Sequence, residues 1–173
     1  MQLIYVKAIT LLELIITILI VAILVTIGLP HFNHMRAKQE SQSVIQLIKQ
    51  SLQFAKQQAA LSRTRIVICP SNSATQCNNN QWSQGFIIFT DANENNQVDH
   101  NEMIYVTHRL NLKYGELRWQ GALNRPNVFF NAQQGLPNGS NGSFYYCSHQ
   151  YIYHKRIILS RMGQVRYEEP NQC

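Results

Sequence analysis

Three groups of polar residues in this sequence have types and spacings that could support chemistry. The first is a lone carboxylate, Glu13, inside an otherwise apolar run. The second is an acidic segment at residues 91–102, and the third is a basic cluster at residues 155–166. Ion pairing in an apolar medium, cation coordination and phosphate binding are the chemistries that these groups suit. Each group therefore predicts a different kind of site.

The acidic segment has the ligand spacing of an EF-hand calcium loop. Its candidate ligands, at loop positions 1, 3, 5, 9 and 12, are Asp91, Asn93, Asn95, Asp99 and Glu102. Asn96 replaces the turn glycine of such loops, and the flanking residues predict strands instead of helices. Two interpretations stay open, a calcium site or a polar hairpin tip built from ordinary turn formers. No other cofactor is expected.

The basic cluster suits contact with phosphates. Its cations are Lys155, Arg156, Arg161 and Arg166. A few exposed cations give weak, salt-dependent binding that does not depend on nucleic-acid sequence. Three tyrosines close by in sequence could stack on exposed bases: Tyr151, Tyr153 and Tyr167. The alternatives are a solvated basic face and contacts with acidic surfaces of neighbouring subunits.

Catalytic groups do not converge in this sequence, so an enzyme is not expected. His31 and His34 follow the apolar run, where an interfacial role suits them better than catalysis. The other four histidines have no Ser or Cys nucleophile motif beside them. The chain also lacks a G-x-S-x-G elbow, a Walker loop and an H-E-x-x-H helix.

Four cysteines lie beyond the apolar run, without C-x-x-C or zinc-finger spacing. Four cysteines allow three connectivities, and closeness in sequence favours Cys69 with Cys77 and Cys147 with Cys173. Disulfides imply an oxidising compartment, which is the periplasm or the cell exterior.

Charge is also segregated along the sequence. Residues 66–108 contain no Lys or Arg and carry a net charge of −4, whereas the rest of the chain carries +10.

The apolar run is long enough to cross a membrane. Residues 9–29 would make a helix of about 31 Å, and a bilayer core is roughly 30 Å thick. A secretory signal peptide would have a small-residue cleavage site after this run, where the sequence has Gly28-Leu29-Pro30-His31. A charged side chain at the centre of a membrane helix costs about 2.5 kcal/mol or more, and less near its ends. Glu13 is therefore expected either to have a specific partner or to reach the headgroups.

The N-terminal segment Lys7-Ala8-Ile9-Thr10-Leu11-Leu12-Glu13-Leu14 resembles the cleavage motif of type IV prepilins. In that family the motif has Gly and Phe where this chain has Ala8 and Ile9. The resemblance implies that prepilin peptidase cuts between Ala8 and Ile9, that Ile9 is N-methylated, and that Glu13 is the fifth mature residue. It also implies that Glu13 meets the cationic N-terminus of a neighbouring subunit and sets the axial register.

The rest of the chain predicts an α+β fold, a long helix packed on a mostly antiparallel sheet. Apolar residues from Ile45 to Ala59 recur every three or four positions, so the helix is expected to run from Asn33 to about Leu61 as an amphipathic element. After Ser62, short β-like runs are separated by turn residues. The predicted strands are Arg65–Cys69, Gly85–Thr90, Met103–Leu110, Tyr114–Trp119, Val128–Asn131, Ser143–Cys147, Arg156–Ser160 and Gln164–Tyr167.

The order of these elements resembles the type IV minor pilins and pseudopilins of the FimT, FimU and GspH group. The matching residues are Cys69-Pro70, the stretch from Trp82 to Asp91, and Arg156-Ile157-Ile158-Leu159-Ser160. In FimT-like members a Gly-Arg-x-Arg motif is linked to DNA binding, and the aligned residues here are Gly163-Gln164-Val165-Arg166. Gln164 replaces the first Arg, although Arg161 could substitute for it.

The resemblance implies four parts: a leader at 1–8, a transmembrane helix at 9–30, its amphipathic continuation at 31–62 and a β head at 63–173. The expected location is the inner membrane, with a periplasmic head and later incorporation into a filament. The expected partners are other major and minor pilins, the prepilin peptidase, the inner membrane and double-stranded DNA. The function implied is that of a minor pilin that primes or joins a type IV pilus and serves DNA uptake. The alternative is a minor pseudopilin at the tip of a type II secretion pseudopilus.

Overall fold

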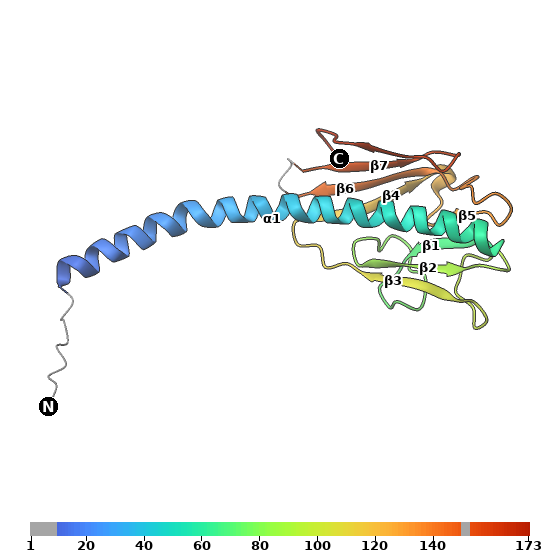
Figure 1. Cartoon of the computed structure of the whole chain (residues 1–173), viewed down its shortest axis with the longest axis horizontal. Helices are drawn as coiled ribbons and strands as arrows, with labels where there is room; N and C mark the ends of the chain where they lie inside the picture. The colour runs from blue at the N-terminus through green and yellow to red at the C-terminus, as the bar shows by residue number, and fades with distance from the viewer. Residues whose placement is uncertain (1–9, 150–152) are drawn as a thin grey trace, which may run out of the picture. The chain divides into compact units, whose positions relative to one another are not determined.

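The computed structural model of this protein describes residues 10–149 and 153–173. The chain divides into two compact units, Met1–Arg36 and Ala37–Cys173. Helix α1 (Leu11–Ser62) begins in the first unit and continues into the second (Figure 1). Thr10 precedes the helix, and its Oγ1 accepts the backbone N–H of Glu13 at 3.3 Å. Because a threonine in this position satisfies a free N–H group of the first turn, it explains why the helix begins there.

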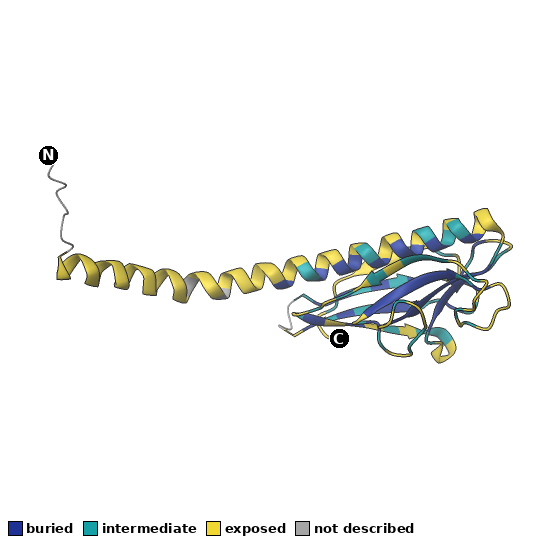
Figure 2. Ribbon diagram, turned by 90° about the horizontal axis from the view of Figure 1, so that it is seen from below, coloured by how far each residue is buried: buried dark blue, intermediate teal, exposed yellow. Residues whose placement is uncertain are grey.

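The described part of the first unit is an apolar helix with exposed side chains. The large aliphatic residues from Leu11 to Val25 are all about half exposed or more (Figure 2). By length and composition, α1 qualifies as a membrane-spanning helix. Exposure of these apolar side chains to water is unfavourable, and no side of the helix is polar. We therefore expect lipid or protein to surround this segment.

Within the second unit, α1 is amphipathic. One face is buried, as Figure 2 shows, and every apolar residue that the periodicity assigned to this face lies in it. These residues are Ile45, Ile48, Leu52, Ala55 and Ala59. The opposite face carries exposed Gln and Lys side chains, including Gln46 and Lys49. The change in pattern along one helix is therefore encoded directly in its sequence.

In the described residues of the second unit, eight antiparallel strands form two sheets (Figure 1). The first sheet has the order β3-β2-β1-β5 and the second has the order β4-β6-β7-β8. The first contains β1 (Ile66–Pro70), β2 (Gly85–Thr90), β3 (Ile104–Arg109) and β5 (Val128–Phe130). The second contains β4 (Gly115–Gly121), β6 (Gly142–Ser148), β7 (Lys155–Leu159) and β8 (Val165–Glu168). A short 3₁₀ turn, η1 (Ala122–Asn124), follows β4.

Two apolar clusters stabilise this unit. The larger one joins the buried face of α1 to both sheets through residues such as Ile68, Phe86 and Phe144. The smaller one lies on the other side of the first sheet and contains Val67 and Phe129. Successive strand residues point to opposite faces, so β1 and β2 serve both clusters and must be apolar throughout. This requirement explains the uninterrupted apolar run of β2.

The strands occur where the sequence predicted them, with ends that differ by one or two residues. The expected α+β pilin-like fold is confirmed. The number of sheets was not predicted. The strands form two sheets, whereas the sequence analysis expected one. β3 and β4 follow each other in sequence but belong to different sheets, and β5 then returns to the first sheet.

Candidate functional site

Glu13 lies in the first turn of α1 and is exposed. A negative charge at this end of a helix interacts favourably with the free N–H groups there. In the part of the chain that the structure describes, no ion pair involves Glu13. Ala8 and Ile9, the predicted cleavage and methylation positions, lie outside the described residues. The pairing of Glu13 with a neighbouring N-terminus therefore remains a prediction about an assembly of subunits.

The acidic segment forms the β2–β3 loop, which a buried ion pair anchors to β1. Asp91 is completely buried, and its Oδ2 lies 3.6 Å from Nε of Arg65. The Asp91 carboxylate also accepts the backbone N–H groups of Asn95 and Asn96 at 3.0 and 3.1 Å. The Arg65 guanidinium lies 4.0 Å from the centre of the Phe129 ring. Burial raises the pKa of Asp91, and the attraction of Arg65 opposes this effect.

The other candidate calcium ligands are occupied within the loop. Glu102 accepts the backbone N–H groups of Ala92 and Asp99 at 2.9 and 3.0 Å. Asp99 accepts the side-chain amides of Asn93 and Asn95 at 2.7 and 2.8 Å. Across residues 10–149 and 153–173, no three His, Cys, Asp or Glu side chains are grouped so that they could hold a metal ion. The contacts within the loop are those of a polar hairpin tip, and the calcium site stays a prediction.

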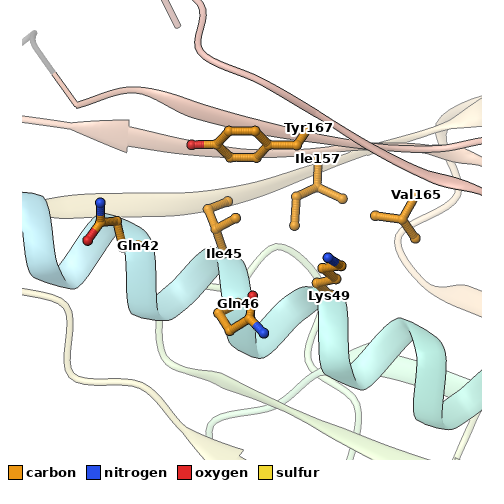
Figure 3. Close-up of a pocket in the computed structure, with 7 residues that line it drawn as sticks. All are labelled: Gln42, Ile45, Gln46, Lys49, Ile157, Val165 and Tyr167. Carbon is orange, nitrogen blue, oxygen red and sulfur yellow. The ribbon is translucent and has the colours of Figure 1, made fainter.

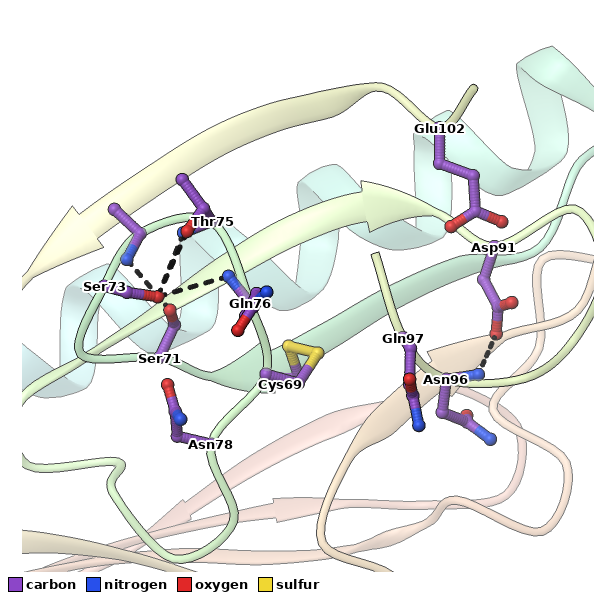
Figure 4. The surroundings of a disulfide bond; sticks show 12 residues. Cys69, Ser71, Ser73, Thr75, Gln76, Asn78, Asp91, Asn96, Gln97 and Glu102 are labelled. Atoms are coloured by element: carbon purple, nitrogen blue, oxygen red, sulfur yellow. Dashed lines mark hydrogen bonds between the residues drawn. A yellow bond between two sulfur atoms is a disulfide. The ribbon is translucent and has the colours of Figure 1, made fainter. Parts of the chain in front are cut away.

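Both expected disulfides form. Cys69 bonds to Cys77 and Cys147 bonds to Cys173, with Cα–Cα distances of 5.5 and 5.6 Å. Cys69 lies in the smaller apolar cluster, which Cys77 and Val98 also cover. Figure 4 shows the Cys69 disulfide between the loop that carries Ser73 and Thr75 and the loop in which Asp91 meets the backbone of Asn96. The bond therefore holds a polar loop over apolar surface that would otherwise face water.

Two of the predicted phosphate-binding cations are already paired with carboxylates. Lys155 is buried and forms an ion pair with Glu169. Burial acts to lower the pKa of Lys155, but its contacts with Glu169 and Tyr167 outweigh that effect and raise it. Arg156 forms an ion pair with Glu168 at 3.2 Å and lies 5.1 Å from the centre of the Tyr145 ring. These two residues therefore act mainly as ties between neighbouring strands.

The remaining residues of the predicted motif are exposed on the β7–β8 hairpin. Arg161 and Gln164 lie in its turn and Arg166 lies on β8. Arg166 is opposite Ile158 in the ladder and shares a sheet face with Arg156, whereas Lys155 lies on the other face. Tyr151 lies outside the described residues. The structure thus divides the predicted basic cluster between two faces and a turn.

Two further features were missed at the sequence level. Glu40 accepts hydrogen bonds from the backbone of Lys113 and Tyr114 and from the hydroxyl of Tyr146. These partners lie 73 to 106 residues away, so no local pattern could identify them. Lys49 and Lys56 border hollows between α1 and the β7–β8 hairpin. Their separation of two helical turns gave a signal, because it places both on one face of the helix.

Two features define a pilin-like α+β protein. One is the apolar N-terminal part of α1, and the other is a head in which the rest of α1 packs on two antiparallel sheets. The structure is similar to that of the type IV minor pilin FimU from Pseudomonas aeruginosa, with a TM-score of 0.54 and 18% sequence identity. That match covers 78% of this chain and 91% of FimU. It is also similar to the minor pseudopilin EpsH from the Type 2 Secretion System of Vibrio cholerae, with a TM-score of 0.52 and 12% identity. The EpsH match covers 76% of this chain and 98% of EpsH.

The family profile described as "Type II transport protein GspH" matches residues 44–163, which is more than half of the chain. This protein therefore belongs to the GspH family, in the group of type IV minor pilins and pseudopilins. A comparison with curated protein sequences gives no significant match. The similar structures are those of a type IV minor pilin and a minor pseudopilin. At 12–18% identity they establish the fold and leave the role of individual residues open.

Proposed function

We propose that this protein is a minor pilin that enters a type IV pilus after its leader, residues 1–8, is removed. The observation that carries the proposal is the contrast along α1. Its side chains from Leu11 to Val25 are apolar and exposed, whereas those from Val44 to Ala59 include the buried face of a folded head. In this proposal residues 9–30 are held by the inner membrane before assembly and by other pilins afterwards. Residues 31–62 continue the helix into a periplasmic head at 63–173.

Glu13 has a specific role in this proposal. Removal of the leader would leave a cationic amine at Ile9, and an unpaired charge among apolar helices is costly. If the Glu13 carboxylate of one subunit pairs with the Ile9 amine of the next, neither charge is left unpaired. Such a pair also fixes how far one subunit is displaced along the next. The exposure of Glu13 in the described helix is compatible with such a contact.

A substitution at Glu13 tests this role. We expect Glu13→Leu to remain in the membrane but to be depleted from sheared filaments, as measured by immunoblotting both fractions. Glu116→Leu is the matched control, since it makes the same change at an exposed carboxylate on β4 of the head. Mass spectrometry of the incorporated protein should find Ile9 as an N-methylated first residue. Normal incorporation of Glu13→Leu, or an intact leader in assembled protein, would contradict the proposal.

A secretion pseudopilus is the second candidate. The family description and the similarity to EpsH support it as well as the similarity to FimU supports a pilus. The two systems differ in what a deletion abolishes. Loss of twitching, piliation or transformation would favour the pilus, and loss of an exported protein from the medium with normal piliation would favour the pseudopilus.

DNA binding is a finer part of the proposal, and it is supported by the exposed Arg161 and Arg166 of the β7–β8 hairpin. We expect full-length protein in detergent to retard a duplex in a mobility-shift assay, with weaker retardation as salt is raised. Arg161→Ala with Arg166→Ala should reduce the shift, whereas Arg109→Ala on β3 should not. A shift that is absent, or that ignores both salt and the two substitutions, would remove DNA binding from the proposal.

A further inference from the structure

Two hollows along α1 join into one groove within the second unit. The first has a volume of about 380 Å³ and is lined by residues from Gln42 to Lys49 of α1 and by Ile157, Val165 and Tyr167 (Figure 3). The second, of about 500 Å³, is lined by residues from Lys49 to Ala60 of α1 and by Gln134, Gly163 and Val165. Lys49 and Val165 border both hollows, so the two hollows follow each other along α1, and we treat them as one groove. From Gln42 to Ala60 it extends for about 27 Å, enough for about eight residues of an extended chain.

One wall of this groove is a strand with a free edge. β8 is the last strand of its sheet, and among the described strands it pairs with β7 alone. Ser160 donates its backbone N–H to the carbonyl of Gln164 at 3.0 Å, which sets the alternation of the ladder. Arg166 then faces β7, whereas Val165 and Tyr167 direct their N–H and C=O groups away from it. Val165 and Tyr167 are also the β8 residues whose side chains line the groove.

The other wall is cationic. Lys49 and Lys56 lie on α1 two helical turns apart, and none of the residues that line the groove is an Asp or a Glu. No ion pair in the described part of the chain uses either lysine. Lys56 lies against the hairpin turn, where a Cβ on Gly163 would come within 3.1 Å of its Nζ. Gly163 also has a φ of +69°, a backbone conformation that favours glycine.

We propose that this groove binds an extended, acidic polypeptide segment of a partner protein, which adds as a strand to the free edge of β8. The segment would use the N–H and C=O groups of Val165 and Tyr167 for main-chain pairing, a known mode of peptide recognition. Alternate side chains of the added strand would face α1, and carboxylates at those positions would meet Lys49 and Lys56. The apolar part of the floor, Ile45 with Ile157, would cover the stems of these side chains.

The groove suits a peptide better than it suits DNA. A strand edge offers alternating donors and acceptors, whereas a phosphate backbone offers acceptors only. The floor between the two walls is partly aliphatic, and the exposed Arg166 lies on the opposite face of β8 from the groove. The inference applies to a pilus and to a pseudopilus alike, because it concerns the head of this protein alone.

The test uses full-length protein in detergent micelles and a fluorescein-labelled octapeptide of alternating Glu and Val. Fluorescence polarisation should show saturable binding. Lys49→Glu with Lys56→Glu should weaken binding about tenfold, as expected when ion pairs at an exposed and a half-buried lysine become repulsive. Arg109→Glu, which changes an exposed cation on the other sheet, is the matched control and should leave the affinity unchanged.

A second probe separates strand addition from simple charge attraction. The same peptide, N-methylated at every residue so that neither of its edges can donate a main-chain hydrogen bond, should lose most of its affinity although its charge is unchanged. In hydrogen exchange followed by NMR, the peptide should protect the amides of Val165 and Tyr167 and leave the already paired Arg166 amide unaffected. Equal binding of the methylated peptide, unchanged exchange at Val165 and Tyr167, or protection of these amides by a DNA duplex that displaces the peptide would each overturn the proposal.

Discussion

Glu40 shows how one side chain can join segments that are far apart in the sequence. It lies on α1, and its carboxylate receives the N–H groups of Lys113 and Tyr114 at 2.9 and 3.0 Å. The hydroxyl of Tyr146, on β6, donates to the same carboxylate at 2.7 Å. Burial and then the Glu40 carboxylate raise the pKa of Tyr146 above its ordinary value, so this tyrosine remains a donor. The contact ties α1 to the β3–β4 connection at the point where the two sheets divide.

Replacement of Glu40 should therefore be costly. We expect Glu40→Ala to lower the free energy of unfolding by about 2–4 kcal/mol, because it leaves the Tyr146 hydroxyl and two backbone N–H groups without their acceptor. Tyr146→Phe should cost about 1 kcal/mol, since Glu40 keeps its two backbone donors. Chemical denaturation followed by circular dichroism measures both. Glu116→Ala, at an exposed carboxylate, is the control and should change the free energy of unfolding by less than about 0.5 kcal/mol. An equally small effect of Glu40→Ala would show that the Glu40 hydrogen bonds do not stabilise the head.

His108 gives the head a dependence on pH. Its ring packs against Phe86, with centroids 4.9 Å apart, and burial lowers its pKa below the ordinary 6.5. The unfolded chain therefore binds a proton more readily than the folded chain does. The resulting stability is complete above pH 6.5 and is lost as the pH falls through the folded-state pKa.

The expected outcome is that the melting temperature of the wild type falls between pH 7.5 and pH 5 by more than that of His108→Gln. Comparison of the two proteins cancels the contribution of the other histidines. His100→Gln, at an exposed position, is the matched control and should follow the wild type. Identical pH profiles for His108→Gln and the wild type would show that the His108 site does not favour the neutral imidazole.

At the scale of elements, the sequence predicted what local patterns determine. The spacing from Ile45 to Ala59 predicted the buried face of α1, and turn residues marked the ends of the strands. The division into two sheets was not predictable, since it depends on which strands pair across long separations. Both disulfides followed from closeness in sequence, and their loops span 8 and 26 residues.

The ion-pair partners of charged residues were predicted less well than the positions of the strands. Lys155 and Arg156 were interpreted as free cations, but the hairpin register brings Glu169 and Glu168 to them from 14 and 12 residues away. Pairing of this kind requires knowledge of the register, which sequence alone leaves open. The role of Arg65 was missed for the same reason, because its partner Asp91 lies in the β2–β3 loop, beyond two strands of the sheet.

The β2–β3 loop should lose its order when Arg65 is removed. We expect Arg65→Ala to cost about 3–5 kcal/mol, because it leaves the buried Asp91 carboxylate without its cation. The double variant Arg65→Met with Asp91→Asn should recover part of that loss, since it removes both charges. Glu94→Gln is the control, because its carboxylate is exposed and meets the same arginine. Denaturation and hydrogen exchange at Asn95 and Asn96 give the two measurements, and a double variant less stable than Arg65→Ala would contradict the explanation.

At the scale of the whole molecule, the chain separates a segment that needs apolar surroundings from one that makes its own core. The carboxylates of residues 66–108 belong to the β2–β3 loop of the head, and Asp91 is used internally. Most of the net positive charge lies elsewhere, on α1 and on the second sheet with its connections. The head can therefore present chemically different surfaces to different neighbours in a filament, while Leu11 to Val25 supply an apolar contact that does not depend on the head.

This separation makes a prediction about the membrane. The wild-type protein should stay with membranes in alkaline carbonate and be released by detergent, because its apolar segment is long enough to span the bilayer. Leu19→Lys, near the middle of residues 9–29, should shift a measurable part of the protein out of the carbonate-resistant fraction, since a lysine at mid-bilayer costs about 2.5–3.5 kcal/mol. Gln57→Lys adds the same charge to an exposed position of α1 in the head and should leave the fractionation unchanged. Release of the wild type by carbonate alone would show that α1 lies on the membrane surface and does not span it. A wild-type profile for Leu19→Lys would show that the segment around Leu19 is not embedded in lipid.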